Sequence, residues 1–270
     1  MNNGTTLSAP RGDEAIRARK TVLDIVIPAF NEAGRLPASL ERIGQHLSSS
    51  SRWLDARLIV VDDGSSDDTA RAAGAVELPS RVSLQLLSHE KNRGKGAAVR
   101  TGLAATAAAL VLITDADLAA PIEELDRLAA TAGENVMVIG SRALQRELIF
   151  VRQPAYRDLM GRTFNLLVRA LLVPDIRDTQ CGFKLLPGRL ARSLATVQRL
   201  DGFAYDVELL LLARRWGYQL REVPVRWHHV EASRVAPLKH SLQMLRDIFR
   251  LAWRRARGTL PGEPGRTAGS

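Results

Sequence analysis

The sequence has little cysteine and no long apolar segment. Cys181 is the only cysteine among 270 residues, so no disulfide can form within the chain, and such usage is typical of a reducing compartment. No run of eighteen apolar residues occurs, and residues 1–20 lack the apolar core of a signal peptide. We therefore expect no membrane-spanning helix. A protein of this kind that acts on a lipid would lie on the membrane surface or use the anchor of a membrane-protein partner.

Aromatic residues and negative charge are also scarce. Aromatic residues make up 5% of the chain and no nucleic-acid recognition motif occurs, which argues against a nucleic-acid partner. The chain has 29 acidic against 38 basic residues, which gives a net charge of +9. An anionic membrane and a phosphorylated substrate remain as candidate partners, and a solvated basic surface without a specific partner is the alternative.

Strand and helix patterns alternate along the chain after a flexible tail at 1–20. Short apolar runs predict strands at 22–27, 58–61, 82–87, 110–113 and 136–139. Helices are expected between these strands. This alternation predicts an α/β fold whose mostly parallel sheet is covered on both faces. The second half is less regular, and we expect helices at 156–172 and 207–216 and strands at 183–186 and 218–227. The expected organisation is one domain at 21–235, a basic amphipathic helix at 236–257 and a flexible tail at 258–270.

Chemically distinctive residues follow the predicted strands, where ligands bind in folds of this class. The sharpest pattern is Asp115-Ala116-Asp117 after the strand at 110–113. Two carboxylates at this spacing can converge on a hard cation such as Mg²⁺ or Mn²⁺, with a ligand diphosphate completing the shell. The alternative is that they cap the next helix. Asp62 and Asp63 also end a strand, and a turn does not explain both carboxylates unless a cation or a hydrogen-bonding group satisfies them.

The segment 92–96, Asn-Arg-Gly-Lys-Gly, offers basic side chains and flexible backbone to a phosphate. It is neither a Walker loop nor a dinucleotide-binding Gly-x-Gly-x-x-Gly motif, and a solvated turn is the alternative.

Together these segments carry a resemblance. The chain resembles family 2 glycosyltransferases of the GT-A fold, specifically those that use dolichyl or polyprenyl phosphate as the acceptor. The matching segments span about 22–250 and are VIPAFNE at 26–32, VVDDGSSD at 60–67, NRGKG at 92–96, DADL at 115–118, GSR at 140–142, DTQCGFK at 178–184, YDVE at 205–208 and VPVRW at 223–227.

The resemblance implies a role for each matched residue. The metal would be held by Asp115 and Asp117, and the catalytic aspartate would be Asp178, with Asp206 as its competitor for a base-like or orienting role. His229 is a further candidate metal ligand, although a packing or surface role is the alternative. The donor nucleotide would contact Pro28, Phe30, Glu32, Asp62, Asp63, Lys95, Asp115, Ala116 and Arg142.

The acceptor implied by the resemblance needs positioning more than proton abstraction. The second pKa of a phosphate monoester is about 6, so its attacking oxygen is already ionised at pH 7. Cationic side chains would let this anion approach the anionic donor, and the candidates are Arg152, Arg157 and Arg162. A solvated helix face is the alternative for each of them.

The resemblance therefore implies an inverting transferase that moves a hexose, glucose first, from a nucleoside diphosphate sugar to a polyprenyl phosphate. We expect UDP rather than GDP as the nucleotide. Mannosyltransferase relatives often carry Gln where this chain has Ala119, which weakens the mannose interpretation. The expected location is cytoplasmic, at the face of an anionic membrane. The rivals are a transferase with another sugar or a soluble acceptor, and a catalytically silent scaffold.

Overall fold

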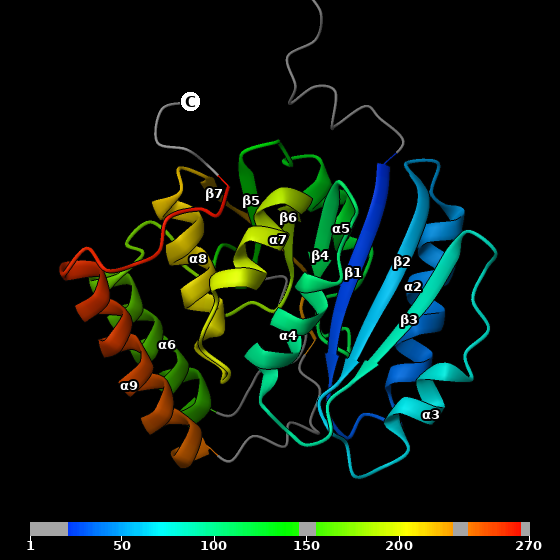
Figure 1. The fold of residues 1–270 in the computed structure, drawn as a ribbon, viewed down its shortest axis with the longest axis horizontal. Helices are drawn as coiled ribbons and strands as arrows, with labels where there is room; N and C mark the ends of the chain where they lie inside the picture. The colour runs from blue at the N-terminus through cyan, green and yellow to red at the C-terminus, as the bar shows by residue number, and fades with distance from the viewer. Residues whose placement is uncertain (1–20, 146–154, 229–236, 266–270) are drawn as a thin grey trace, which may run out of the picture.

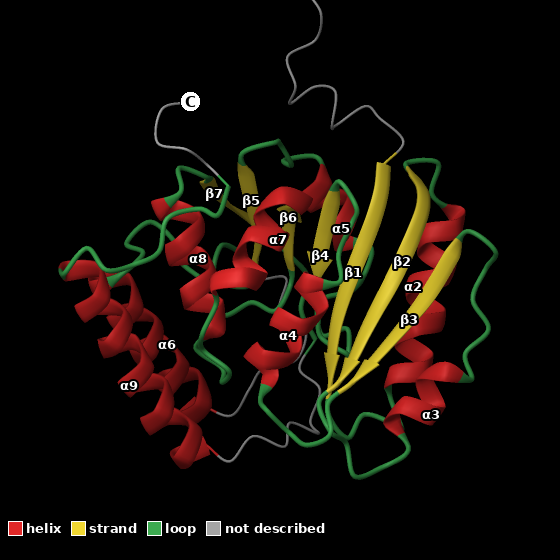
Figure 2. Ribbon diagram, in the orientation of Figure 1, coloured by secondary structure: helices red, strands yellow, loops and turns green. Residues whose placement is uncertain are grey.

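A seven-stranded sheet lies at the centre of the computed structural model, which describes residues 21–145, 155–228 and 237–265 (Figures 1 and 2). The strand order is β3-β2-β1-β4-β6-β5-β7. β6 runs antiparallel to β4 and β5, and the other neighbours are parallel. The strands are β1 (Thr21–Ala29), β2 (Trp53–Asp62), β3 (Val82–Ser88), β4 (Leu110–Ile113), β5 (Val136–Ser141), β6 (Lys184–Pro187) and β7 (Gln219–Pro224).

Helices cover both faces of the sheet (Figure 2). One face packs against α2 (Leu36–Ser49), α3 (Thr69–Gly74) and α5 (Glu124–Ala129). The other packs against α4 (Lys95–Ala104), α7 (Gly188–Val197) and α8 (Tyr205–Arg215). Beyond α8 lie two further helices that contact each other, α6 (Ala155–Leu171) and α9 (Pro237–Ala256). The predicted α/β fold with a mostly parallel sheet is confirmed.

The two-sided burial explains why the strands read as continuous apolar runs. Successive side chains of a strand point to opposite faces. In β4, Leu110 and Leu112 enter the cluster beneath α2 and α5, whereas Val111 and Ile113 enter the cluster beneath α7 and α8. All four are buried, so no polar residue interrupts the strand.

The structure departs from the sequence-based expectations mainly in the second half. Helix α7 was not expected, and β6, for which the sequence indicated no direction, is antiparallel to its neighbours. Helix α4 begins at Lys95, directly after Gly94, whose φ of 105° ends the preceding loop.

The chain after α9 is packed against the domain, whereas a flexible tail was expected from 258. Leu260 is buried, and Trp216 donates its indole N–H to the carbonyl of Pro261 at 3.0 Å. Glu263 is buried too, where it accepts a 2.9 Å hydrogen bond from the hydroxyl of Tyr218. Because these residues find partners in the turn between α8 and β7, this segment is held in place. The tails expected at 1–20 and 266–270 lie outside the described residues.

No helix among the described residues is both long and apolar enough to cross a membrane.

Candidate active site

The candidate site lies where strands β1, β2, β4 and β5 end, at the edge to which the arrowheads of β1 to β3 point in Figure 1. The carboxyl ends of parallel strands meet at one edge of a sheet. β6 is antiparallel, so its beginning lies at this same edge. The topology thus brings the DTQCGFK segment at 178–184 to the loops that follow β4 and β5.

Asp115 pairs with Lys95 at the centre of this edge. The ammonium Nζ of Lys95, in the first turn of α4, lies 2.6 Å from Oδ1 of Asp115. Burial raises the pKa of Asp115, but the charges of Lys95, Lys184 and Arg142 outweigh it and hold that pKa below its ordinary value. The carboxylate is therefore anionic and already has one cationic partner.

Asp117 lies beside this pair without an equivalent counter-ion among the described residues. Its Oδ1 accepts a 3.1 Å hydrogen bond from the amide of Ala119. Burial and the adjacent negative charge of Asp115 raise the pKa of Asp117. A divalent cation would relieve this repulsion, and two carboxylates are oxygen ligands of the kind that Mg²⁺ and Mn²⁺ prefer. No cluster of three or more potential metal ligands occurs within the described residues.

Gly182 lets the backbone before β6 approach this carboxylate. A Cβ at position 182 would lie 2.4 Å from Oδ2 of Asp115. Only glycine leaves room for the Asp115 side chain in its present position.

Asp178 binds Arg142 through one edge of the guanidinium and through the backbone amide. Nε of Arg142 donates to Oδ2 at 2.7 Å, Nη2 donates to Oδ1 at 2.9 Å, and the Arg142 amide donates to Oδ2 at 2.9 Å. The guanidinium also stacks on the Trp227 ring at 5.5 Å. Burial raises the pKa of Asp178, but Arg142 outweighs it and leaves the pKa below its ordinary value. Of the two roles considered for Asp178, this geometry favours orientation of Arg142 over proton abstraction.

Asp206 is buried and paired with Lys184. The Lys184 ammonium contacts both the Asp206 carboxylate and the carbonyl of Cys181, and it is fully shielded from solvent. Burial raises the pKa of Asp206 beyond what the Lys184 and Lys95 charges offset. Sequence reasoning gave Lys184 no role, although its place in the DTQCGFK segment was a signal.

Asp62 and Asp63 are satisfied by the protein itself. Oδ1 of Asp62 accepts the Ser65 amide at 3.0 Å, which forms a turn. Asp63 accepts hydrogen bonds from the amides of Arg93 at 2.9 Å and Gly94 at 2.7 Å, and its Oδ1 lies 2.7 Å from Nδ1 of His89. The cation considered for this pair is therefore not required.

Three backbone amides of segment 92–96 already have partners within the protein. The amides of Arg93 and Gly94 donate to Asp63, and the Gly96 amide donates to the carbonyl of Asp201 at 2.7 Å. These three amides are therefore not available to a phosphate, and the side chain of Lys95 extends to Asp115.

Known proteins of similar sequence identify the family of this chain. The profile of glycosyl transferase family 2 matches residues 24–191. The chain belongs to glycosyl transferase family 2. It is 36% identical over 251 residues to a dolichyl-phosphate beta-glucosyltransferase of Drosophila melanogaster, covering 86% of this chain and 77% of the relative. It is 34% identical over 239 residues to the protein of that name from Homo sapiens, covering 84% and 74%.

Solved structures share the fold. Glucosyl-3-phosphoglycerate synthase of Mycobacterium tuberculosis, in complex with Mg²⁺ and UDP, superimposes with a TM-score of 0.61 at 24% identity, covering 92% of this chain and 83% of that one. Mannosyl-3-phosphoglycerate synthase of Rubrobacter xylanophilus gives 0.64 at 18% identity, covering 96% and 82%. The chain is thus a single-domain glycosyltransferase of the GT-A-like fold.

The other predicted residues of this family 2 enzyme are spread over the same edge. Pro28 and Ala116 are buried, and Phe30 is exposed. Glu32 is held by Arg35, whose Nη2 lies 2.6 Å from Oε1, an i, i+3 pairing that sequence reasoning passed over.

Four predicted residues cannot be placed fully. His229 and Arg152 lie outside the described residues, and Arg157 and Arg162 lie on α6 where only the backbone is described.

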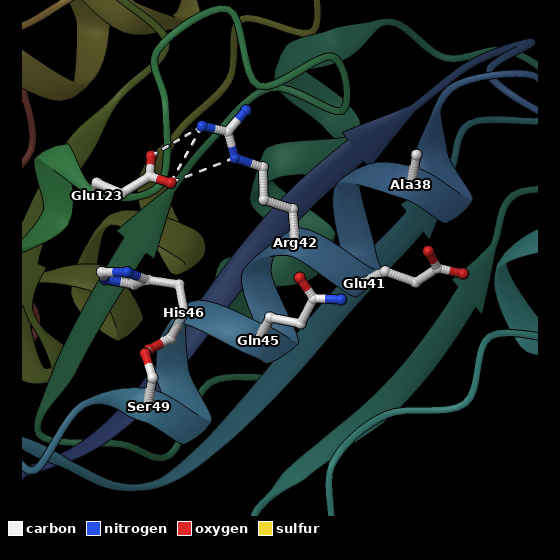
Figure 3. A pocket seen from close by; sticks show the side chains of 7 residues that line it. All are labelled: Ala38, Glu41, Arg42, Gln45, His46, Ser49 and Glu123. Atoms are coloured by element: carbon white, nitrogen blue, oxygen red, sulfur yellow. Dashed lines mark hydrogen bonds and ion pairs between the residues drawn. The ribbon is translucent and has the colours of Figure 1, made fainter.

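A hollow on the outer face of α2 is separate from this site (Figure 3). Arg42 and Glu123 form a 3.0 Å ion pair at its rim, and His46 and Gln45 contribute to its wall. None of the predicted donor, metal or catalytic residues lines it.

Proposed function

We propose that this enzyme transfers glucose from a nucleoside diphosphate sugar, UDP-glucose first, to a dolichyl or other polyprenyl phosphate, with inversion at the anomeric carbon. The observation that carries the proposal is the carboxylate pair Asp115 and Asp117 beside Lys95, with the oriented guanidinium of Arg142 at the same edge. The names of the relatives support glucose and the dolichyl phosphate acceptor. The UDP bound by the M. tuberculosis neighbour supports the nucleotide.

The residues at the edge divide the work of the transfer. Asp115 and Asp117 hold a divalent cation, which when bound neutralises the charge on the diphosphate leaving group. Arg142, kept in place by Asp178 and Trp227, binds phosphate oxygens. Lys95 supplies a second cationic side chain next to Asp115.

The bond changes need no strong base. An ionised oxygen of the lipid phosphate attacks the anomeric carbon, and the bond from that carbon to the diphosphate oxygen breaks. The nucleoside diphosphate departs with the electron pair. Because the attacking oxygen carries no proton at pH 7, Asp178 and Asp206 serve the reaction by orienting Arg142 and Lys184.

A surface formed by α6 and α9 is proposed to rest on an anionic membrane, at its cytoplasmic face. Leu242, Phe249 and Trp253 of α9 are 72%, 56% and 56% exposed, and Leu166 of α6 is 64% exposed. The three α9 residues are spaced i, i+7, i+11 and so share one side of the helix. Both helices begin toward the edge at which the strands end (Figure 1). A lipid phosphate at this surface would therefore lie near the site.

Basic side chains accompany the apolar surface. The exposed arginines of α9 among the described residues include Arg246 and Arg250. Each such side chain near an anionic surface contributes about 1 kcal/mol. Co-sedimentation with vesicles that contain phosphatidylglycerol tests this surface. Phe249→Glu should reduce pelleting, whereas the matched change Val22→Glu, at an exposed apolar residue of β1, should not; equal pelleting of both variants contradicts the proposal.

The reaction is tested with the full chain, Mg²⁺ or Mn²⁺, a short polyprenyl phosphate and a panel of UDP- and GDP-sugars. We expect nucleoside diphosphate release that requires both the lipid phosphate and UDP-glucose. 3-Phosphoglycerate serves as the matched soluble acceptor. Turnover with it alone would replace the lipid acceptor by a soluble one, and absence of nucleotide binding would favour a silent scaffold.

A further inference from the structure

Glu208 is a buried carboxylate of the YDVE segment that the proposed reaction does not use. It lies on α8 two residues after Asp206, so the two side chains leave the helix in different directions. Only 2% of its side chain is exposed. A carboxylate at this depth is costly unless its oxygens receive hydrogen bonds.

The Glu208 carboxylate fastens the loop that follows α7. Its Oε2 accepts hydrogen bonds from the amides of Leu200 at 2.8 Å and Arg199 at 3.0 Å. Its Oε1 lies 3.9 Å from Nη1 of Arg254 on α9. Two backbone donors converging on one oxygen fix the course of the chain at 199–200.

The 198–201 loop contacts the first turn of α4 through hydrogen bonds and an ion pair. The carbonyl of Asp201 accepts the Gly96 amide at 2.7 Å, and Nε2 of Gln198 donates to the Gly96 carbonyl at 2.8 Å. An ion pair of 2.7 Å joins Arg100 to Asp201. The approach is so close that a Cβ on Gly96 would lie 2.2 Å from the carbonyl oxygen of Leu200.

The helical turn that this loop contacts includes Lys95. Helix α4 begins at Lys95, whose ammonium reaches Asp115. We propose that Glu208 is a positioning residue for Lys95: by holding the 198–201 loop it sets the first turn of α4 and so places the ammonium at Asp115. Glu208 itself touches neither donor nor metal. This inference rests on the proposed function, in which Lys95 acts at the donor diphosphate.

The first test is a double-mutant cycle on the full chain, with the dissociation constant of UDP in Mg²⁺ as the readout. Lys95→Met and Glu208→Leu should each weaken UDP binding by roughly tenfold, which corresponds to about 1.4 kcal/mol. The double variant should bind no more weakly than Lys95→Met alone, since Glu208 acts through Lys95. Glu208→Gln keeps one acceptor oxygen and should restore most of the affinity.

Glu263→Leu is the matched control. Glu263 is also a buried carboxylate with hydrogen-bonding partners, but these are Tyr218 and Arg189 rather than the 198–201 loop. It should lower the melting temperature without changing UDP affinity. The positioning role is wrong if Glu208→Leu lowers the melting temperature but leaves UDP affinity unchanged. It is also wrong if the double variant loses affinity by the product of the two single losses.

Hydrogen–deuterium exchange tests the link independently of the donor. Glu208→Leu should speed exchange in peptides covering 93–100, and Glu263→Leu should not. Unchanged exchange there overturns the inference. If Glu208→Leu speeds exchange but Lys95→Met binds UDP normally, Glu208 does hold the first turn of α4, and the proposed role of Lys95 at the donor is wrong. Should Glu208→Leu not fold, Glu208→Asp, which is one methylene too short to reach both amides, replaces it with the same expectations.

Discussion

Two pairs of aspartates lie at the same edge of the sheet and differ in the hydrogen-bonding partners that the fold gives them. Asp62 is the last residue of β2 and Asp63 is the first residue of the loop after it. Asp115 and Asp117 lie in the loop after β4, and β1 lies between β2 and β4 in the sheet. The first pair receives hydrogen bonds from backbone amides, from the hydroxyl of Ser65 and from the ring of His89. The second has one lysine for two carboxylates among the described residues.

The difference shows how similar sequence patterns acquire different roles. In the first loop the chain turns back at Gly64 and Ser65, and segment 92–96 supplies further N–H groups. In the second loop, the hydrogen bond to Asp117 among the described residues comes from one amide, that of Ala119, so an added cation would find a carboxylate without an ion-pair partner there. The first pair is built into the fold, and the second is where binding chemistry is expected.

Replacing Asp117 should have the largest effect on binding. Asp117→Asn should weaken metal-dependent UDP binding by about 100-fold or more, because a cation would lose a charged ligand. The free energy of unfolding should stay level or rise slightly, because the repulsion from Asp115 is relieved. Calorimetric titration with Mg²⁺ and UDP measures the first quantity and urea unfolding the second. An unchanged titration would remove Asp117 from the metal site.

A side chain at position 182 should disturb the same pair indirectly. Gly182→Ala places a methyl group against the Asp115 carboxylate, so we expect roughly tenfold weaker UDP binding and a stability loss of about 1–3 kcal/mol. Gly74→Ala, where a Cβ meets nothing within 4 Å, is the matched control and should be neutral or stabilising. Equal behaviour of the two variants would contradict the close approach.

A change at Asp63, in the first pair, should mainly lower the free energy of unfolding. Asp63→Asn weakens the acceptor for the Arg93 and Gly94 amides and should cost about 1–3 kcal/mol in urea unfolding. Its effect on UDP affinity should be smaller than that of Asp117→Asn. A larger loss of affinity in the folded variant would instead show that Asp63 contacts the nucleoside, as the family resemblance implies.

Asp24 provides a reference carboxylate far from both pairs, with the smallest expected effect. Burial raises its pKa, but hydrogen bonds from Arg57, Ala107 and Ala108 outweigh this and leave the pKa below the ordinary 3.8. Its stabilisation is therefore present above pH 3.8 and is lost as the pH falls through the lowered pKa. Asp24→Asn should cost about 1 kcal/mol at pH 7, and the difference from the parent should shrink below pH 3.8. A difference independent of pH would contradict the ion pair.

The alternating pattern of apolar runs and helices was sufficient to predict the α/β class and the edge that carries the site. The motif at 115–117 lies at that edge, where the structure pairs Asp115 with Lys95. The antiparallel β6 and helix α7 were not predicted, because a four-residue apolar strand carries no signal of its direction. The packing of 258–263 was missed because its partners, Trp216 and Tyr218, lie far away in the sequence.

The sequence by itself determined the α/β class and most of the strands of this glycosyltransferase, because burial on two faces requires continuous apolar strands and because motifs of the family are local. Tertiary structure alone decided which charged residues are left for chemistry. The partners that settle this are Arg93 and Gly94 for Asp63, Lys95 for Asp115 and Asp178 for Arg142, all at least 20 positions away along the chain. A carboxylate becomes structural or reactive according to the donors that folding brings to it, and local sequence does not contain them.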